Sequence, residues 1–281
     1  MIPIPEPSSA HSVADWVEFE VVTSGQSLSR AKLETLIEQA AGDEPSESFI
    51  NDIWLQLEQR QELYGAAAPF ETQARITVPK TNWKDCPEYV SCLLWSMLGA
   101  TNDGDAGPKL FERISRIALA RYLKGEALVF GWPVVAGETD TIENKVKTLA
   151  ETLRERFVEA PAGRYKDRGV DIVGWKPFAD GRPSQSIVFT QCAAGHNWRT
   201  KTRDVPLKAW NEYVHWATSP TAGLTIPQIV PQELWHEIAS EAGLLIDRAR
   251  ILPLVQEAPA DAALRDELIV WCEAKIAANA I

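Results

Sequence analysis

The sequence predicts an α/β protein in which helices and strands are mixed along the chain and build a mixed sheet. Two observations support this. Apolar residues recur at helical spacing in several segments, and short β-branched runs such as residues 170–173 and 187–190 stand between them. The composition agrees, because 45% of the 281 residues are apolar and 24% are charged, as in an ordinary folded domain.

In the N-terminal part, residues 13–22 alternate enough between apolar and polar side chains to predict a strand. Ser27 or Ser29 can cap a helix that ends at Gly42. Three further elements are predicted at residues 47–64 (helix), 72–78 (strand) and 88–98 (helix). The Gly- and Asp-rich residues 99–108 then mark a break between domains.

The same patterns predict the elements of the second half of the chain. They are a helix at 109–123, a strand at 127–132, a helix at 141–158, strands at 170–173 and 187–191, a helix at 205–217, a strand at 224–230, and helices at 232–242 and 261–277. Without the helix at 141–158, the order from 109 to 230 is αβββαβ. We therefore expect four regions: a flexible N-terminus (1–12), an α/β docking region (13–100), the αβββαβ core (101–230) and a C-terminal helical region (231–281).

The net charge of −11 argues against a protein that coats nucleic acid without specificity. Residues 154–208, however, hold eleven basic and six acidic side chains. This basic segment is compatible with a local polyanion site, and equally with solvated charges on loops and helix faces. No run of about 18 apolar residues and no signal segment occurs, so we expect a cytoplasmic protein that does not enter a membrane.

The cysteines indicate a reducing compartment. Cys86, Cys92, Cys192 and Cys272 have no paired spacing and are expected to be free thiols. Cys192 and His196 are four residues apart, but no second pair completes a zinc site. His196 could serve as a general base or be a solvated loop residue.

Three polar side chains near the ends of predicted strands and helices are candidates for a catalytic or metal-binding site. Asp171 stands near the start of one strand and Gln191 at the end of the next. If the strands pair, both side chains reach the same end of the sheet, provided that they leave on the same face. Glu112, in the helix at 109–123, lies close to its apolar face, where it either points at this site or remains a surface residue.

This arrangement resembles the PD-(D/E)XK nucleases, the restriction-endonuclease-like superfamily, and within it the Q-x-K variant of Mrr-type enzymes. The resemblance rests on Glu112, Asp171 and Gln191 and on the αβββαβ order. It implies that these three residues hold Mg²⁺ (or Mn²⁺) for phosphodiester hydrolysis. The family's lysine, two residues after Gln191, is replaced by Ala193. Lys201 or Lys208 would then supply the catalytic ammonium group, with Lys176 as a third option.

The resemblance also implies a role and partners. We expect nucleic acid, with DNA ahead of RNA, to contact a basic and aromatic set made of Lys176, Arg182, Trp198, Arg199 and Arg203. The role expected is bacterial restriction or anti-phage defence, with a helicase or ATPase subunit as possible partner of the N-terminal region. Two alternatives stay open: a catalytically inactive module that binds nucleic acid or a protein, and an unrelated α/β adaptor or metabolic enzyme.

Overall fold

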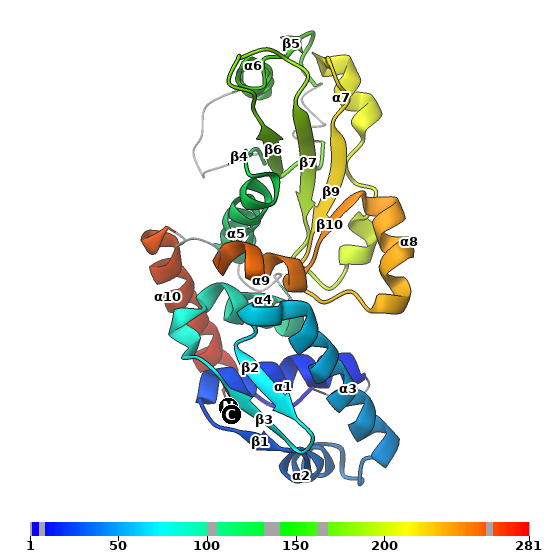
Figure 1. Ribbon diagram of the computed structural model, residues 1–281, viewed down its shortest axis with the longest axis vertical. Coiled ribbons are helices and arrows are strands. Elements are labelled where there is room, and N and C mark those ends of the chain that lie inside the picture. The colour runs from blue at the N-terminus through cyan, green and yellow to red at the C-terminus, as the bar shows by residue number, and fades with distance from the viewer. Residues whose placement is uncertain are drawn as a thin grey trace. The chain divides into compact units, whose positions relative to one another are not determined.

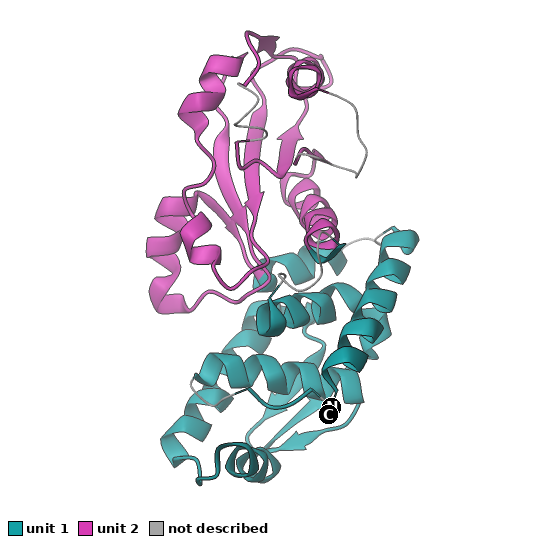
Figure 2. Ribbon diagram, turned by 180° about the vertical axis from the view of Figure 1, so that it is seen from behind, with its two compact units in different colours: residues 1–107, 248–281 teal, residues 108–247 magenta. Residues whose placement is uncertain are grey.

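The computed structural model describes residues 2–5, 9–99, 106–131, 141–161, 168–256 and 261–280. The chain forms two compact units (Figure 2). Unit 1 combines residues 1–107 with 248–281, and unit 2 consists of residues 108–247. Unit 2 is thus inserted into unit 1. The boundary expected at residue 231 lies instead at 247–248, because α8 and β10 complete the sheet of unit 2.

Unit 1 is mainly helical (Figure 1). Its elements are α1 (Ala10–Ser24), β1 (Leu28–Ser29), α2 (Arg30–Ala41), α3 (Glu47–Tyr64), η1 (Gly65–Ala67), β2 (Phe70–Gln73), β3 (Ile76–Pro79), η2 (Trp83–Asp85), α4 (Pro87–Leu98), α9 (Arg248–Gln256) and α10 (Ala262–Asn279). The single strand expected at 72–78 is the hairpin β2–β3, to which β1 adds a third, antiparallel strand. The N-terminus is partly fixed, since Ile2 is buried and its carbonyl accepts the indole N–H of Trp16 at 2.9 Å.

The strand predicted at residues 13–22 is wrong, because this segment is the core helix α1. The polar residues of this segment predicted the solvent-facing side of a strand. In the structure Asp15 and Glu18 are buried together with the apolar residues around them. A helix surrounded by protein is apolar on nearly all sides, so it shows little 3.6-residue period. Gly25, with φ of 68°, ends the helix.

The acids of α1 belong to a buried ionic network that closes unit 1. Arg60 donates to Asp15 at 2.7 Å and to Glu18 at 2.6 Å, and Arg248 reaches Asp15 from α9. Tyr64 donates to Glu18 at 3.0 Å. Burial works to raise the pKa of Asp15, but the two guanidinium groups outweigh it and bring that pKa to about 2. Arg248 is therefore part of an internal ion-pair network.

Unit 2 contains a five-stranded mixed sheet in the order β10-β9-β7-β6-β4. Its elements are α5 (Ala106–Leu123), β4 (Glu126–Val129), α6 (Ile142–Thr152), β5 (Arg156–Phe157), β6 (Ile172–Lys176), β7 (Ser186–Cys192), η3 (Trp198–Lys201), α7 (Leu207–Tyr213), β8 (Val214–His215), β9 (Thr221–Thr225), α8 (Gln232–Ala242) and β10 (Leu244–Ile246). β4, β6 and β7 are antiparallel neighbours, whereas β9 runs parallel to β7 and to β10. The predicted α/β class is confirmed. The elements α5, β4, β6, β7, α7 and β9 follow one another in the expected order, with α6, β5, η3 and β8 between them.

Helices cover both faces of this sheet (Figure 1). On one face α5 packs closely: a Cβ on Gly174 of β6 would lie 2.6 Å from a methyl carbon of Leu119. On the other face, α6 and α7 share a core with alternate residues of β6 and β7, among them Phe189, Trp175 and Trp210. The hairpin register pairs Ile172 with Thr190. This pairing brings Asp171 and the end of β7 to the same end of the sheet.

Candidate active site

Glu112 reaches the end of the sheet from the second turn of α5. The residue is 7% exposed, and the ammonium group of Lys109 donates to both of its carboxylate oxygens, at 3.2 and 3.1 Å. Residues three apart on a helix share a face, so this pairing follows from the local sequence. The surface alternative for Glu112 is therefore wrong, because its carboxylate is buried.

Asp171 is held by three segments just before β6 begins. Its N–H donates to the carbonyl of Thr190 at 3.0 Å, and its carbonyl accepts the N–H groups of Phe130 and Gly131 at 2.7 and 3.1 Å. Its carboxylate oxygen Oδ2 accepts the N–H of Cys192 at 2.6 Å. A side chain thus takes the place of a main-chain acceptor at the end of the ladder. The other oxygen, Oδ1, lies toward Gly131.

The two carboxylates meet at Gly131, the residue that follows the end of β4 by two positions. A Cβ placed on Gly131 would lie 3.4 Å from Oδ1 of Asp171 and 3.8 Å from Oε2 of Glu112. The pKa of the Cys192 thiol also reflects these two carboxylates. Burial raises this pKa well above the ordinary value, and the charges of Asp171 and Glu112 raise it further. Cys192 is therefore a neutral thiol beside two acids.

Gln191 lies at the same end of the sheet as these two acids. The hairpin register pairs Ile172 with Thr190, so one step further along the hairpin Gln191 stands opposite Asp171. The amide oxygen of Gln191 lies 2.9 Å from where a Cβ on Gly169 would stand, two residues before Asp171. This oxygen is buried and accepts no hydrogen bond from any described residue. The structure thus brings Asp171 and Glu112 together at Gly131, and the role of Gln191 as a third ligand stays a prediction.

The three lysines predicted for catalysis lie in different places. Lys201 pairs with Asp204 at 2.9 Å, and the carbonyl of Asp204 lies beside Gly169, two residues before Asp171. Lys208 is exposed on α7. Lys176 is the last residue of β6, and Asp171 precedes its first, so about 16 Å of strand separates them. Lys176 is thus excluded as the catalytic lysine.

Two lysines that the sequence analysis did not select occupy the position instead. Lys109 contacts Glu112, as described above. Lys145, from α6, donates to the carbonyls of Phe130 and Gly131 at 3.3 and 3.4 Å. The spacing of Lys109 and Glu112 was a visible signal. No local pattern indicates Lys145, because α6 is placed by its packing on the sheet.

The basic residues predicted to bind nucleic acid do not form one face around the acids. Trp198 is buried in a cluster with Leu224 and Ile238, so its ring cannot stack on a base. The guanidinium of Arg199 lies 5.5 Å from the centre of the Trp198 ring, and Arg203 pairs with Glu241. Lys176 and Arg182 lie at the other end of β6 or in the loop beyond it, where Arg182 pairs with Asp180 at 2.6 Å. Two further basic residues of segment 154–208, Arg164 and Lys166, lie outside the described residues.

The donor set fits a magnesium ion better than zinc. Within the described parts of the chain, no three His, Cys, Asp or Glu side chains gather to hold a metal. Mg²⁺ is commonly bound by only one or two carboxylates, together with waters and substrate phosphate oxygens. Asp171 and Glu112 provide two such carboxylates facing the space in front of Gly131. The residues present therefore fit Mg²⁺ or Mn²⁺.

Comparisons with models of known protein families, with functionally described proteins and with solved structures give no significant match. No helix in the described parts of the chain has the length and apolar character needed to cross a membrane.

Proposed function

We propose that unit 2 is a metal-dependent phosphodiesterase that hydrolyses nucleic acid. The observation that carries the proposal is the meeting of Asp171 and Glu112 at Gly131, at one end of a sheet with αβββαβ order. Two carboxylates at a half-buried site repel each other, and such pairs are typical of sites that recruit a cation. The PD-(D/E)XK resemblance adds support, since it selected the same two residues.

In this proposal each residue has a defined task. Asp171 and Glu112 would hold Mg²⁺, which when bound neutralises phosphate charge and acidifies a water molecule. The N–H of Cys192 fixes the carboxylate of Asp171. Lys109 balances the charge of Glu112 before substrate arrives and is then placed to donate to a phosphate oxygen. It takes the role that the family gives to the lysine missing at Ala193.

The biological setting is proposed on the resemblance. The substrate would be DNA ahead of RNA, and the role would be bacterial restriction or anti-phage defence in the cytoplasm. Unit 1, in which we identify no site of this kind among the described residues, would be the part that contacts a helicase or ATPase subunit.

A second candidate is a catalytically inactive module that binds nucleic acid or a protein. One observation favours it: Ala193 stands at the lysine position of the family motif. This candidate predicts binding without cleavage under any metal.

The deciding experiment is a cleavage assay on single- and double-stranded DNA and RNA with Mg²⁺, with Mn²⁺ and with EDTA. Asp171→Asn keeps the shape and can still accept the N–H of Cys192, so its stability in EDTA should equal or exceed that of the wild type. Its cleavage should fall by orders of magnitude. Glu143→Gln changes a surface acid that pairs with Lys147 and serves as the matched control. Metal-independent cleavage, or equal cleavage by wild type and Asp171→Asn, would refute the proposal.

A further inference from the structure

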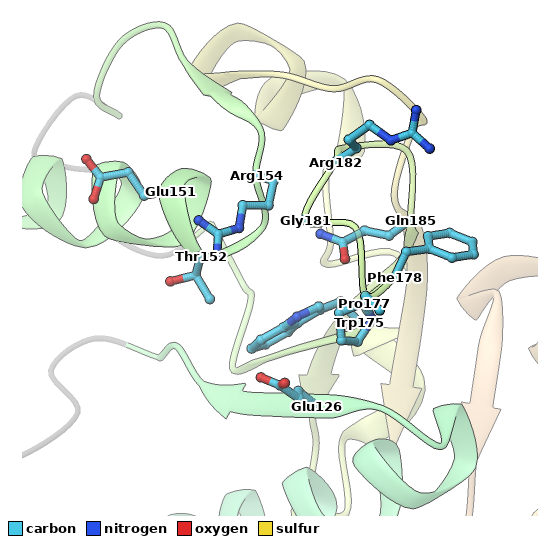
Figure 3. Close-up of a pocket in the computed structure, with 11 residues that line it drawn as sticks. Glu126, Glu151, Thr152, Arg154, Trp175, Pro177, Phe178, Gly181, Arg182 and Gln185 are labelled. Carbon is cyan, nitrogen blue, oxygen red and sulfur yellow. The ribbon is translucent and has the colours of Figure 1, made fainter.

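Unit 2 contains a cavity at the end of β6 opposite to Asp171 (Figure 3). Its volume is about 580 Å³, within the range of about 300–1,000 Å³ common for small-molecule sites. Residues from three places line it: Glu151 and Arg154 at the end of α6, Glu126 and Trp175 on β4 and β6, and Phe178 and Gln185 in the β6–β7 loop.

Arg154 occupies a backbone position that normally belongs to glycine. Its φ is 60°, and it follows α6 in a helix-ending turn in which the N–H of Glu155 donates to the carbonyl of Ala150 at 2.8 Å. Gln185, only 4% exposed, holds this turn by donating to the carbonyl of Leu153. An arginine at such a place is strained, and strained positions are frequent in binding sites.

The charged groups of the cavity do not satisfy one another. Within the described residues, the side chains of Arg154, Glu126 and Glu151 make no hydrogen bond or ion pair. The indole nitrogen of Trp175 also makes no hydrogen bond to a described residue, and it is not fully buried. Arg182 also lines the cavity but pairs with Asp180. The groups without a partner are thus one cation, two carboxylates and a ring N–H.

Apolar surface completes the site. Trp175 and Pro177 form part of the wall, and Phe178 is 63% exposed beside them. An exposed aromatic ring at the mouth of a cavity is well suited to contact a planar group. A ligand that fits must be partly planar and must carry both an anionic group and hydrogen-bond donors.

We propose that this cavity binds one nucleotide. Its phosphate would pair with Arg154, its base would lie against the exposed ring of Phe178, and the base's exocyclic amine would donate to Glu126 or Glu151. Guanine, cytosine and adenine carry such an amine. Uracil and thymine present a carbonyl there, which the carboxylates repel. Bases with the amine should therefore bind more tightly.

The proposal deepens the proposed function, on which it rests for the source of the nucleotide. Trp175 lies four residues along β6 from Asp171, about 13 Å at strand spacing. A strand cleaved at the acids could therefore leave an unpaired nucleotide in the cavity. A free mononucleotide offers the same chemistry, and the experiment distinguishes the two sources.

The experiment is calorimetry on the full chain in EDTA, where no cleavage occurs. Guanosine and cytidine 5′-monophosphate should bind at least about tenfold more tightly than uridine 5′-monophosphate, and inorganic phosphate should bind weakest. Tighter binding of a single-stranded oligonucleotide than of the mononucleotide identifies a strand as the ligand. Equal binding identifies the free nucleotide.

Arg154→Gly is the decisive variant. Glycine suits a φ of 60°, so the melting temperature should stay or rise, while nucleotide binding should weaken at least about tenfold. Lys124→Gly is the matched control, because Lys124 has a φ of 46° in a similar turn after α5 and does not line the cavity. It should keep full binding.

Two results would overturn the inference: no nucleotide binding by the wild type, or equal weakening by both glycine variants. Neither result would contradict the proposed cleavage activity, because that activity is tested with Mg²⁺ and depends on Asp171. Conversely, nucleotide binding in EDTA by a protein that never cleaves would leave the cavity assignment intact and support the inactive module.

Discussion

Lys109 donates to both carboxylate oxygens of Glu112, at 3.2 and 3.1 Å, from one turn earlier in α5. The pair places a cation beside the acid site without any residue of the family's lysine motif. If Lys109 serves the chemistry, Lys109→Met should lower cleavage by about 100-fold, because a donor to the developing charge is lost. The melting temperature should change little, since the side chain is partly exposed. Steady-state kinetics on the purified variant would measure this.

Lys201→Met is the comparison for that prediction, since Lys201 pairs with Asp204 and not with either acid of the site. A larger loss of cleavage in Lys201→Met than in Lys109→Met would indicate that Lys201 supplies the catalytic ammonium group, as the sequence predicts.

Gly131 provides a test of the space between the carboxylates. A Cβ there would make ordinary contacts with Asp171 and Glu112, so Gly131→Ala should change the free energy of unfolding by no more than about 1 kcal/mol. The methyl group would nevertheless occupy the place where an ion and its waters must sit. Cleavage should fall by more than about tenfold, with a higher Mg²⁺ requirement.

Gly169→Ala gives the contrasting result. Its φ is 71° and the new Cβ would lie 2.6 Å from the carbonyl oxygen of Asp204, so this variant should lose stability as well as activity. Chemical denaturation of both variants distinguishes the two cases. A Gly131→Ala enzyme with normal Mg²⁺ dependence would argue against a metal at this point.

The basic residues of η3 can be tested by salt dependence. Arg199 is exposed over Trp198, and Lys201 is half-buried beside Asp204. If both contact phosphates, reversing them to Glu should weaken nucleic-acid binding and reduce the slope of log K against log salt by about one unit per contact. Fluorescence anisotropy at several salt concentrations measures the slope. An unchanged slope would mean that these charges are only a solvated surface.

The buried network of unit 1 predicts a specific pH dependence. The pKa of Asp15 is about 2 in the folded protein against 3.8 for the free group, so its ionised form is stabilised by folding. This contribution is complete above the unfolded pKa and is lost as pH falls from about 4 to about 2, at a cost of about 2 kcal/mol. Hydrogen exchange of the α1 amides at pH 6 and pH 3 would report it.

Arg248→Met should remove most of that pH dependence and destabilise unit 1 by about 3–5 kcal/mol, because a buried carboxylate loses a partner. A surface change, Glu273→Gln, removes an exposed pair with Lys84 and should leave the exchange of α1 unchanged. An acid response of α1 that persists in Arg248→Met would place its origin elsewhere.

The sequence predicted the core of unit 2 because its elements have local signals. The β-branched runs around Asp171 and Gln191 form the β6–β7 hairpin, and the order from α5 to β9 is as expected. The two-residue period of the two strands also predicted that Asp171 and Gln191 reach the same end of the sheet, in agreement with the register that pairs Ile172 with Thr190.

Features that depend on distant residues were not predictable in this way. The helix α1 was mistaken for a strand because Asp15 and Glu18 look solvent-facing. Their partner Arg60 lies 45 and 42 residues away, and Arg248 lies 233 residues from Asp15. Lys145 and the cavity at Trp175 likewise arise only when α6 packs on the sheet.

The insertion of one unit into the other also sets the order in which the chain matures on the ribosome. Residues 108–247 are contiguous, so this unit can form as soon as it emerges. The helix α1 is synthesised first, but Asp15 gains its partner Arg248 only near the end of synthesis. The helix α4, which packs on α1, likewise gains its contacts with α10 only then. A nascent chain arrested before residue 248 should thus carry a folded inner unit and an exposed, protease-sensitive N-terminal segment.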